Sequence, residues 1–377
     1  MRVAVMGSQA KDLLNFRGHL LSEMVKAGHV AFGLAPEGSP AISASLQNLG
    51  ATFVPVPMDR TGVNPLRELQ NLFRLWRILR GLKLDLLLTY ELKPVVFGVL
   101  AARCAFIPRR FAMITGRGTT LQGEARGFRE RMVRAVVKRL YRLALPGTQG
   151  VLFQNHDDCS LFLDERMLPE TTPRKIINGS GVDLEHFALS ELPSGPVVFL
   201  FVGRLLRNKG VQEFVNASRI LWQEQIPARF LILGPLDVNP NGILKSQLDG
   251  WVQEGFVEYL GEAADVRPIL ARAHVLVLPS YGEGTPRSVL EALSMGRAIV
   301  TTHAPGCRET VKNDINGNLV PVGDVGALSD AMEKLALNPA MITRFAREGR
   351  KMAEQKYDVR LVTAEILSFL GLTRTSS

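Results

Sequence analysis

The 377-residue chain is 46% hydrophobic and 21% charged, the composition of a globular protein with enough apolar residues for two domain cores. Its net charge of +9 is concentrated in residues 1–196, which hold 25 Lys and Arg against 17 Asp and Glu, but no nucleic-acid-binding motif accompanies this charge. Three scattered cysteines and six scattered histidines argue against a disulfide framework and a protein-built metal cage, and they favour a reducing compartment.

The first half of the chain alternates predicted strands and helices. The N-terminal "MRVAVMGSQA" has too short an apolar run for a signal peptide and predicts a strand instead. Apolar, β-branched runs predict strands over residues 3–7, 30–35, 52–56, 85–90, 110–115 and 150–155. Helical patterns begin at Asn64 and Gly127, and the apolar stretch from Pro94 is too short to span a bilayer. Continuous apolar strands separated by helices predict a parallel sheet covered on both faces.

The helical pattern that begins at Gly127 is both basic and amphipathic. Its arginines and lysines, among them Arg129 and Lys138, alternate with apolar side chains at helical spacing from Phe128 to Leu143. A basic amphipathic helix is typical of binding to the surface of an anionic membrane. The alternative is a helix that packs on the core and has a solvated polar face. The positive charge of the first half favours the membrane interpretation.

Residues 189–196, "LSELPSGP", predict an interdomain linker. The alternation then restarts, with predicted strands over residues 197–203, 228–234, 256–261, 274–279 and 298–302. Two such units in succession predict an α/β protein with two Rossmann-like domains. We expect the first domain over residues 1–190 and the second over 191–357. We also expect a helix over 358–377 to pack back on the first domain.

The carboxyl ends of the strands are where open α/β sheets bind ligands. The stretch "FVGRLLRNKG" places Arg204 directly after a predicted strand and Lys209 at the start of a helix. Two cations at one strand end suit a diphosphate, in charge and in donor geometry. A solvated basic loop is the alternative.

A second strand end is followed by "YGEGTPRSVLEALSMG", residues 281–296. We expect Thr285 to be the N-cap and Pro286 the first residue of a helix. Gly296 is expected to end that helix, because glycine readily adopts the left-handed conformation found there.

Glu283 and Glu291 flank the start of this predicted helix. Glu283 would lie in the loop, and Glu291 would lie roughly 8 Å further along the helix axis. One element cannot hold these carboxylates face to face as a glycosidase pair, so they address different parts of one extended ligand. The amides of Gly284–Arg287 and the helix dipole suit a phosphate between them. Taken singly, Glu291 is better explained as a surface helix glutamate and Glu283 as a loop carboxylate that favours the helix N-terminus. It is their arrangement that favours a ligand.

Several stretches together resemble the family 4 retaining glycosyltransferases of the GT-B fold. Those in the second half are "FVGRLLRNKG", "LILGP", "VEYLGEAADVRPILARAHVLVLPS", "GEGTPRSVLEALSMG" and "PGCRETVKNDINGNLV". Those in the first half are "MDRTGVNPLREL", "ELKPVVFGVLAAR", "MITGRG" and "INGSGVDLEHF". The first-half stretches resemble a branch that acts on polyprenyl-diphosphate-linked sugars in surface polysaccharide and glycan assembly. The resemblance implies two Rossmann-like domains that face each other across a cleft.

The resemblance also implies roles for individual residues. Arg204 and Lys209 would hold the donor diphosphate, Glu283 would contact the donor hexose, and Glu291 would accept hydrogen bonds from the ribose. The turn Gly7–Ser8 would lie near the donor phosphates, with a plain tight turn as its alternative. The other residues implied for the donor site are Gly203, Leu260, Gly284, Thr285, Pro286 and Arg287. The residues implied for the acceptor or the membrane are Arg17, Arg117, Arg129 and Lys138.

The function implied in this way is transfer of a sugar, expected to be an N-acetylhexosamine, from a UDP-sugar to a polyprenyl-diphosphate-linked saccharide. Such an enzyme would retain the anomeric configuration, need no metal or other cofactor, and work in the cytoplasm on the inner face of the cell membrane. Its products would serve lipopolysaccharide, O-antigen or related glycan synthesis. Two alternatives stay open: a nucleotide-sugar epimerase or hydrolase of the same fold, and a non-catalytic two-lobed sugar-binding protein.

Overall fold

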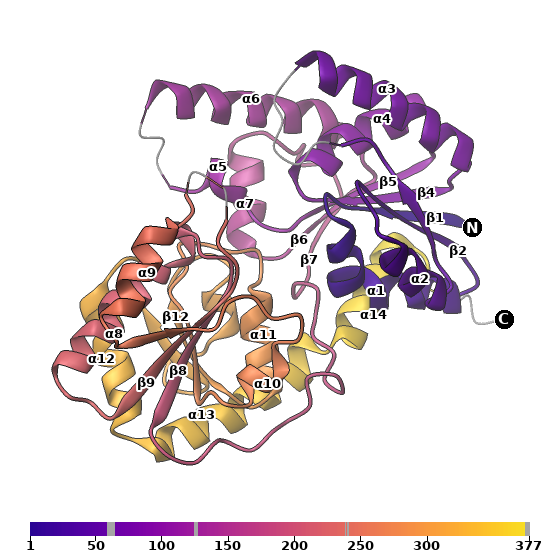
Figure 1. The fold of residues 1–377 in the computed structure, drawn as a ribbon. Coiled ribbons are helices and arrows are strands. Elements are labelled where there is room, and N and C mark those ends of the chain that lie inside the picture. The colour runs from indigo at the N-terminus through magenta and orange to yellow at the C-terminus, as the bar shows by residue number, and fades with distance from the viewer. Residues whose placement is uncertain (59–64, 124–126, 238, 240, 374–377) are drawn as a thin grey trace. The chain divides into compact units, whose positions relative to one another are not determined.

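The computed structural model describes residues 1–58, 65–123, 127–237, 239 and 241–373, and the chain divides into two compact units (Figure 1). Unit 1 comprises Met1–Ser180 and Arg360–Ser377, and unit 2 comprises Gly181–Val359. Each unit contains a parallel sheet flanked by helices, so the predicted pair of Rossmann-like α/β domains is confirmed.

Unit 1 contains a parallel sheet with the strand order β3-β2-β1-β4-β5-β6-β7 among the described residues. Its strands are β1 (Arg2–Met6), β2 (Val30–Ala35), β3 (Thr52–Pro55), β4 (Leu86–Tyr90), β5 (Arg109–Ile114), β6 (Gly150–Phe153) and β7 (Arg174–Ile176). Its helices are α1 (Ala10–Lys26), α2 (Pro40–Asn48), α3 (Pro65–Leu82), α4 (Val99–Cys104), α5 (Gly118–Leu121), α6 (Phe128–Ala144), α7 (His156–Asp164) and α14 (Val359–Leu370). A π-helical turn over Pro94–Gly98 leads directly into α4.

The alternation of side chains along the strands of unit 1 sorts its helices onto two faces (Figure 1). Val3 and Val5 of β1 share a core cluster with α1 and with Val362 and Ile366 of α14. Their neighbour Ala4 points the other way and shares a cluster with α3 and α4. The C-terminal helix is therefore part of the core of unit 1.

Unit 2 contains a parallel sheet with the strand order β10-β9-β8-β11-β12-β13 among the described residues. Its strands are β8 (Val197–Val202), β9 (Ala228–Leu233), β10 (Val257–Tyr259), β11 (Val275–Leu278), β12 (Ala298–Thr302) and β13 (Gly317–Val320). Its helices are α8 (Val211–Gln223), α9 (Lys245–Gln253), α10 (Arg267–Leu270), α11 (Arg287–Ser294), α12 (Val325–Ala336) and α13 (Pro339–Met352).

The proposed linker 189–196 lies inside unit 2, and not between the two units. The guanidinium of Arg297, which is fully buried, donates hydrogen bonds of 3.0 Å to the carbonyl oxygens of Ser190 and Glu191. These bonds fix the segment to the domain that follows it. The structure therefore places the boundaries at 180/181 and 359/360, where the sequence predicted 190/191 and 357/358.

The two sheets have a topological feature in common. In unit 1, β1 lies between β2 and β4, so the direction of chain progression reverses between β1 and β4. In unit 2, the same reversal occurs between β8 and β11. The crevice outside the carboxyl ends of the strands at such a reversal is the usual ligand position in open α/β sheets.

Candidate functional site

The reversal in unit 2 brings together the two stretches that the sequence singled out. The chain leaves β8 through Gly203 and Arg204, and it leaves β11 toward Glu283. Gly234, at the end of the neighbouring β9, has a φ of 144°, and a Cβ there would lie 1.9 Å from the Gly203 carbonyl oxygen. Glycine is thus required for the ends of β8 and β9 to approach so closely.

Lys209 and Glu283 form an ion pair beside this reversal. The Nζ atom of Lys209 lies 2.5 Å from Oε1 of Glu283, and the hydroxyl of Ser280 donates to the same oxygen at 2.8 Å. The side chains of Lys209 and Glu283 are only 22% and 12% exposed. A charged pair with so little solvent around it interacts more strongly than an exposed one. The structure therefore joins the cation predicted for the diphosphate to the carboxylate predicted for the hexose.

Two glycines allow the segments around this pair to approach each other. Gly210 has a φ of 74°, and a Cβ there would lie 2.1 Å from the Pro279 carbonyl oxygen. Gly306 has a φ of 79°, and a Cβ there would lie 2.3 Å from the Glu283 carbonyl oxygen. The Glu283 amide also donates to the Pro305 carbonyl at 2.9 Å. These contacts fix the backbone that carries Lys209 and Glu283.

The N-terminus of α11 differs from the prediction. Pro286 is the N-cap, with φ −71° and ψ 112°, and Arg287 is the first helical residue. Thr285 was predicted as the N-cap, and the structure corrects this, because the extended ψ of Pro286 delays the first turn by one residue. The predicted end is confirmed, since Gly296 has a φ of 73°. The shift leaves the amides at Gly284–Arg287 outside the hydrogen-bonded body of the helix.

Glu291 forms its own ion pair, separate from that of Glu283. Its Oε1 atom lies 3.0 Å from Nε of Arg287, one helical turn earlier. Burial raises the pKa of the Glu291 carboxyl above its usual value, and the Arg287 guanidinium lowers it only in part. The two glutamates thus have different partners, which agrees with two contacts along one extended ligand and not with an acid and nucleophile pair.

Arg204 and Leu260 follow β8 and β10 of the same sheet, with β9 between these two strands. Arg204 forms a 2.8 Å ion pair with Asp237, a residue beyond the end of β9 that the sequence reasoning missed. Its side chain is 48% exposed, so a ligand can reach it. Leu260 follows β10, is partly buried, and donates its amide to the Ile232 carbonyl at 2.9 Å.

Cys307 is a buried thiol near the Lys209–Glu283 pair. Burial, together with the nearby Glu283 carboxylate, raises the pKa of this thiol to about 12. A thiol with such a pKa is neutral at physiological pH and is a weak nucleophile. Nucleophilic catalysis by Cys307 is therefore not supported.

The reversal in unit 1 has a polar cluster at the predicted Gly7–Ser8 turn. The Ser8 amide donates to Oε2 of Glu91 at 2.9 Å, and the Ser8 hydroxyl donates to the same oxygen. A Cβ on Gly7 would lie 2.1 Å from Oη of Tyr90, so this position requires glycine. Glu91 follows β4 directly and has a φ of 69°, uncommon for a residue with a side chain. The sequence reasoning missed Glu91, although its place directly after a predicted strand was a usable signal.

The four residues proposed for the acceptor or the membrane have different environments. Arg17 is 2% exposed and its guanidinium lies 4.9 Å from the centre of the Tyr90 ring, so the proposed membrane contact is wrong for this residue. Arg117 forms a 2.6 Å ion pair with the buried Asp158. Lys138 forms an ion pair with Glu165 at 2.8 Å. Arg129 is exposed on the surface.

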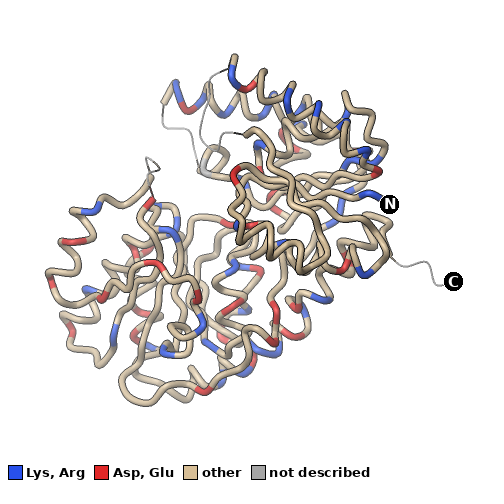
Figure 2. The backbone as a smooth tube through the Cα atoms, turned by 45° about the vertical axis from the view of Figure 1, so that its right-hand side comes forward, with Lys and Arg blue, Asp and Glu red and all other residues tan. Residues whose placement is uncertain are grey.

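The apolar row predicted on α6 is largely uncovered within unit 1. Phe128, Met132 and Val136 are 75%, 53% and 50% exposed, and Leu143 is 56% exposed. The helix contacts the core through Val137, Tyr141 and Ala144 instead. Arginine and lysine residues lie along both α6 and α3 (Figure 2). The predicted apolar row is therefore a surface feature and not the side of the helix that packs on the core.

Membrane-spanning helices and metal-binding clusters are both absent from the described part of the chain. No helix in the described part of the chain is long and apolar enough to cross a membrane. Among the same residues, no group of three or more histidine, cysteine, aspartate or glutamate side chains is arranged to hold a metal ion.

The two Rossmann-like domains are those of the GT-B fold, and solved glycosyltransferase structures agree on it. A glycosyltransferase from Rickettsia africae superposes with a TM-score of 0.76 at 16% identity, covering 100% of this chain and 99% of that one. Anabaena HepE in complex with UDP-glucose superposes with a TM-score of 0.75 at 18% identity, covering 98% and 99%. These similarities concern the fold alone.

The family assignment comes from the sequence comparisons. Residues 196–338 match the family described as Glycosyl transferases group 1. Over 381 aligned residues the chain is 29% identical to N,N'-diacetylbacillosaminyl-diphospho-undecaprenol alpha-1,3-N-acetylgalactosaminyltransferase of Campylobacter jejuni, with 97% of each protein covered. It is 27% identical to UDP-Gal:alpha-D-GlcNAc-diphosphoundecaprenol alpha-1,3-galactosyltransferase of Escherichia coli, with 80% and 79% covered. Residues 196–338 therefore match a group 1 glycosyltransferase domain, and the resemblance to family 4 glycosyltransferases is confirmed.

Proposed function

We propose that this glycosyltransferase moves a sugar from a UDP-sugar to a saccharide carried on polyprenyl diphosphate, in the synthesis of a cell-surface glycan. The observation that carries the proposal is the Lys209–Glu283 pair at the reversal of the unit 2 sheet, one loop before α11. Two relatives that match most of the chain are named as transferases acting on diphospho-undecaprenol-linked sugars. An N-acetylhexosamine is the sugar that we expect to be transferred.

The proposed donor contacts follow the order of groups in a UDP-sugar. The diphosphate binds Lys209 and Arg204 beside the N-terminus of α11, since cations and the positive end of a helix dipole suit an anion. The hexose, bonded directly to the diphosphate, meets Glu283, the direct partner of Lys209. The ribose, on the other side of the diphosphate, meets Glu291. Each ligand group thus has one side chain of matching chemistry.

The proposed catalytic contribution is electrostatic. Negative charge develops on the diphosphate as its bond to the sugar breaks, and the cations of Lys209 and Arg204 stabilise that charge. We propose that the acceptor hydroxyl attacks on the face from which the diphosphate leaves, so that the anomeric configuration is retained. The departing phosphate oxygen then takes the acceptor proton. In this scheme the two cations and the helix amides neutralise the diphosphate without a metal ion.

The proposed cellular location is the inner face of the cell membrane, to which the protein binds peripherally from the cytoplasm. The uncovered apolar row of α6, flanked by arginines, supports this proposal. A helix of this chemistry lies in the interface of an anionic membrane. Its substrate would be anchored in the same membrane.

The experiment that tests the proposed function is a product analysis. The purified protein is incubated with a panel of nucleotide sugars and a synthetic polyprenyl-diphosphate sugar, with and without EDTA, and products are identified by mass spectrometry. The expected result is an acceptor longer by one sugar, made from a UDP-N-acetylhexosamine and insensitive to EDTA. Free sugar or an epimerised donor without any longer acceptor would instead establish the epimerase or hydrolase alternative. NMR of the product linkage decides between retention and inversion.

A further inference from the structure

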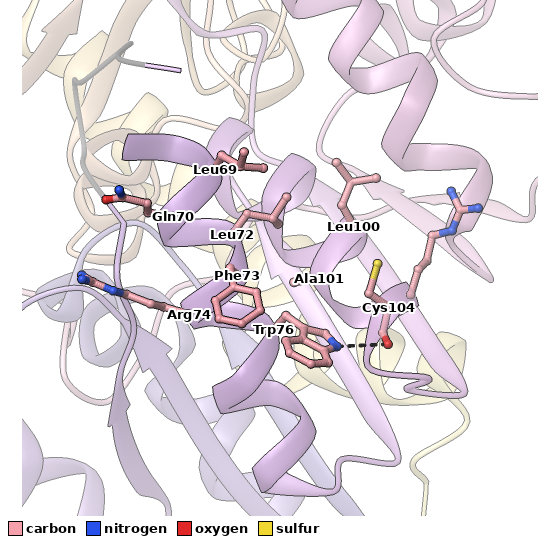
Figure 3. A pocket seen from close by; sticks show the side chains of 10 residues that line it. Leu69, Gln70, Leu72, Phe73, Arg74, Trp76, Leu100, Ala101 and Cys104 are labelled. Atoms are coloured by element: carbon pink, nitrogen blue, oxygen red, sulfur yellow. Dashed lines mark hydrogen bonds between the residues drawn. The ribbon is translucent and has the colours of Figure 1, made fainter. Parts of the chain in front are cut away.

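An apolar groove of about 1040 Å³ lies on unit 1 between α3 and α4 (Figure 3). Side chains of α3, including Phe73 and Trp76, form one wall, and Leu100 and Ala101 of α4 contribute to the other. The groove is as large as many ligand sites, which are concave and mostly apolar. It belongs to neither strand-end cluster described above.

The aromatic wall of the groove is fixed by one hydrogen bond. The indole N–H of Trp76 donates to the Cys104 carbonyl at 3.2 Å, so the polar atom of the ring already has a partner (Figure 3). The Phe73 ring lies beside it, with 5.3 Å between ring centroids. The Arg80 guanidinium also lies 5.5 Å from the centre of the Trp76 ring, so the indole contacts a cation as well as Phe73. Because Ala101 ends at its Cβ, the opposite wall leaves room for a ligand.

The groove continues onto an exposed apolar surface of α3. Leu66, Leu69 and Phe73 are 74%, 65% and 57% exposed and recur at helical spacing. The opposite side of the same helix is already buried, with Leu75 and Leu79 at 1% and 0% exposure. A helix that is apolar on two sides normally has both of them covered. The second side of α3 therefore fits an apolar occupant.

The positive charges around the groove limit which apolar ligands can bind there. Arg74 and Arg103 line it, and α3 also carries the exposed Arg77 and Arg80. The acidic Glu68 at the start of α3 does not offset them, because it pairs with Lys93 at 2.5 Å. A second copy of this basic face would be repelled by like charge. An apolar chain with an anionic head group satisfies both the groove and its arginines.

We propose that the groove holds the isoprenoid chain of the lipid that carries the acceptor sugar, next to its diphosphate. The inference rests on the acceptor class proposed above and adds the place where its lipid is held. An isoprenoid chain is methyl-branched and therefore thicker than a straight acyl chain, which suits a wide groove with aromatic walls. Burying such a chain is favourable because it removes apolar surface from water.

The alkylation rate of Cys104 reports directly whether the groove is occupied. Its thiol lines the groove and is exposed, whereas Cys159 and Cys307 are buried. The full-length protein is alkylated with iodoacetamide in the presence of geranylgeranyl diphosphate below its critical micelle concentration. The rate at Cys104 is followed by mass spectrometry. At ten times the dissociation constant the rate should fall about tenfold, because only the unoccupied fraction reacts.

Two variants and two ligands make this measurement specific. Phe73→Glu places a charge in the groove and should abolish the protection. Phe128→Glu alters a phenylalanine on α6 that is also more than half exposed, and it should leave the protection unchanged. Inorganic diphosphate and a straight-chain alkyl phosphate of equal length should protect at least several-fold less than the isoprenoid.

Each other outcome overturns the proposal. No protection means that the groove is not an isoprenoid site, equal protection by the alkyl phosphate means a general lipid groove, and protection by inorganic diphosphate alone means anion binding. The readout does not depend on sugar transfer. If the enzyme elongates the polyprenyl-linked acceptor but Cys104 is not protected, the groove assignment fails and the proposed function stands. If Cys104 is protected but no sugar is transferred, the groove binds an isoprenoid and the proposed function fails.

Discussion

The two units of this protein leave their apolar side chains in different places. In the described part of unit 2 most buried apolar residues belong to one core cluster, and the exposed large apolar residues, such as Trp222 and Ile315, are scattered. In unit 1 most of the exposed large apolar residues lie on α3 and α6. Those on the two helices are Leu66, Leu69, Phe73, Phe128, Met132, Val133, Val136 and Leu143. Scattered exposed residues need no explanation, whereas a gathered set indicates a surface that binds something apolar.

Helices α13 and α6 illustrate the same difference. Both are amphipathic and basic. The apolar side chains of α13, such as Ile342 and Phe345, are buried against unit 2. Those of α6 that lie at the same spacing are half or more exposed, as for Phe128 and Met132. Helix α13 thus packs its apolar side on the core of unit 2, whereas α6 of unit 1 leaves part of its apolar side exposed for a partner. Substitutions in unit 2 should therefore impair the chemistry, and those on α6 should impair lipid binding.

The largest effect is expected for Lys209→Ala. Loss of a cation that stabilises the departing diphosphate should lower the turnover number about 100- to 1,000-fold. Steady-state kinetics with a water-soluble acceptor measures this without a membrane. Lys351→Ala is the matched control, because Lys351 is an exposed cation on α13 of the same unit that also pairs with a glutamate, Glu348. Near-normal turnover in Lys209→Ala, with a folded protein, would refute the assignment of unit 2.

A smaller effect on the same chemistry is expected for Gly306→Ala. The new Cβ would meet the carbonyl oxygens of Glu283 and Gly284 at 2.3 and 2.5 Å, so the loop must move. A displacement of about 1 Å at a reacting centre lowers the rate about 10- to 100-fold. Gly326→Ala in α12 is the control, since its Cβ would meet nothing closer than 3.5 Å. Equal kinetics in the two variants would show that Gly306 does not position the loop.

For unit 1 the comparison predicts a lipid-binding effect and unchanged chemistry. Phe128→Glu should weaken binding to anionic vesicles about tenfold, because a buried phenylalanine contributes about 1.5–3 kcal/mol. Vesicle flotation at low salt measures the dissociation constant, and the water-soluble acceptor reports turnover. Phe106→Glu, at an 86% exposed phenylalanine outside α3 and α6, should leave vesicle binding unchanged. Equal binding by both variants, or no binding by the unaltered protein, would remove the membrane role of α6.

The smallest effect is a pH dependence caused by Glu291. Burial raises the pKa of this carboxyl above 4.5, so it becomes protonated as pH falls through its raised pKa. The protonated form accepts ribose hydrogen bonds less well, and the KM for the donor should rise about fivefold, as expected for about 1 kcal/mol. Glu291→Gln should remove this pH dependence. A KM that varies with pH equally in both proteins would assign the titration to another group.

The raised pKa of Glu291 also affects the stability of the fold. Acid weakens donor binding through this group, but it favours the folded state. The folded protein holds the Glu291 proton more tightly than the unfolded chain, so this group stabilises the fold below pH 4.5. That contribution is lost as pH rises through the raised pKa. Comparing thermal unfolding of Glu291→Gln with that of the unaltered protein at acidic and neutral pH tests this, and the variant should gain relative stability at neutral pH.

The sequence predicted the sheets because their strands are apolar throughout. The predicted strand 298–302 matches β12 in full, and 30–35 matches β2. It missed β7 and β13, which are short edge strands that pair with one neighbour each. Their stability comes from pairing across the chain, a signal that local patterns do not contain. It also mistook 189–196 for a linker, because the buried contacts of Arg297 come from a residue far away in sequence.

Local sequence alone determined the strand–helix order, the two α/β domains and the strand ends where polar residues follow. It also determined Gly296 as the end of α11, since those features depend on periodicity and on single residues with special conformations. Only the tertiary structure paired Lys209 with Glu283, buried Arg17, and placed Glu91 on the Ser8 amide. It alone decided that the apolar row of α6 is uncovered while that of α13 is buried. Which side of an amphipathic helix meets the core depends on partners distant in the chain, so no local pattern can specify it.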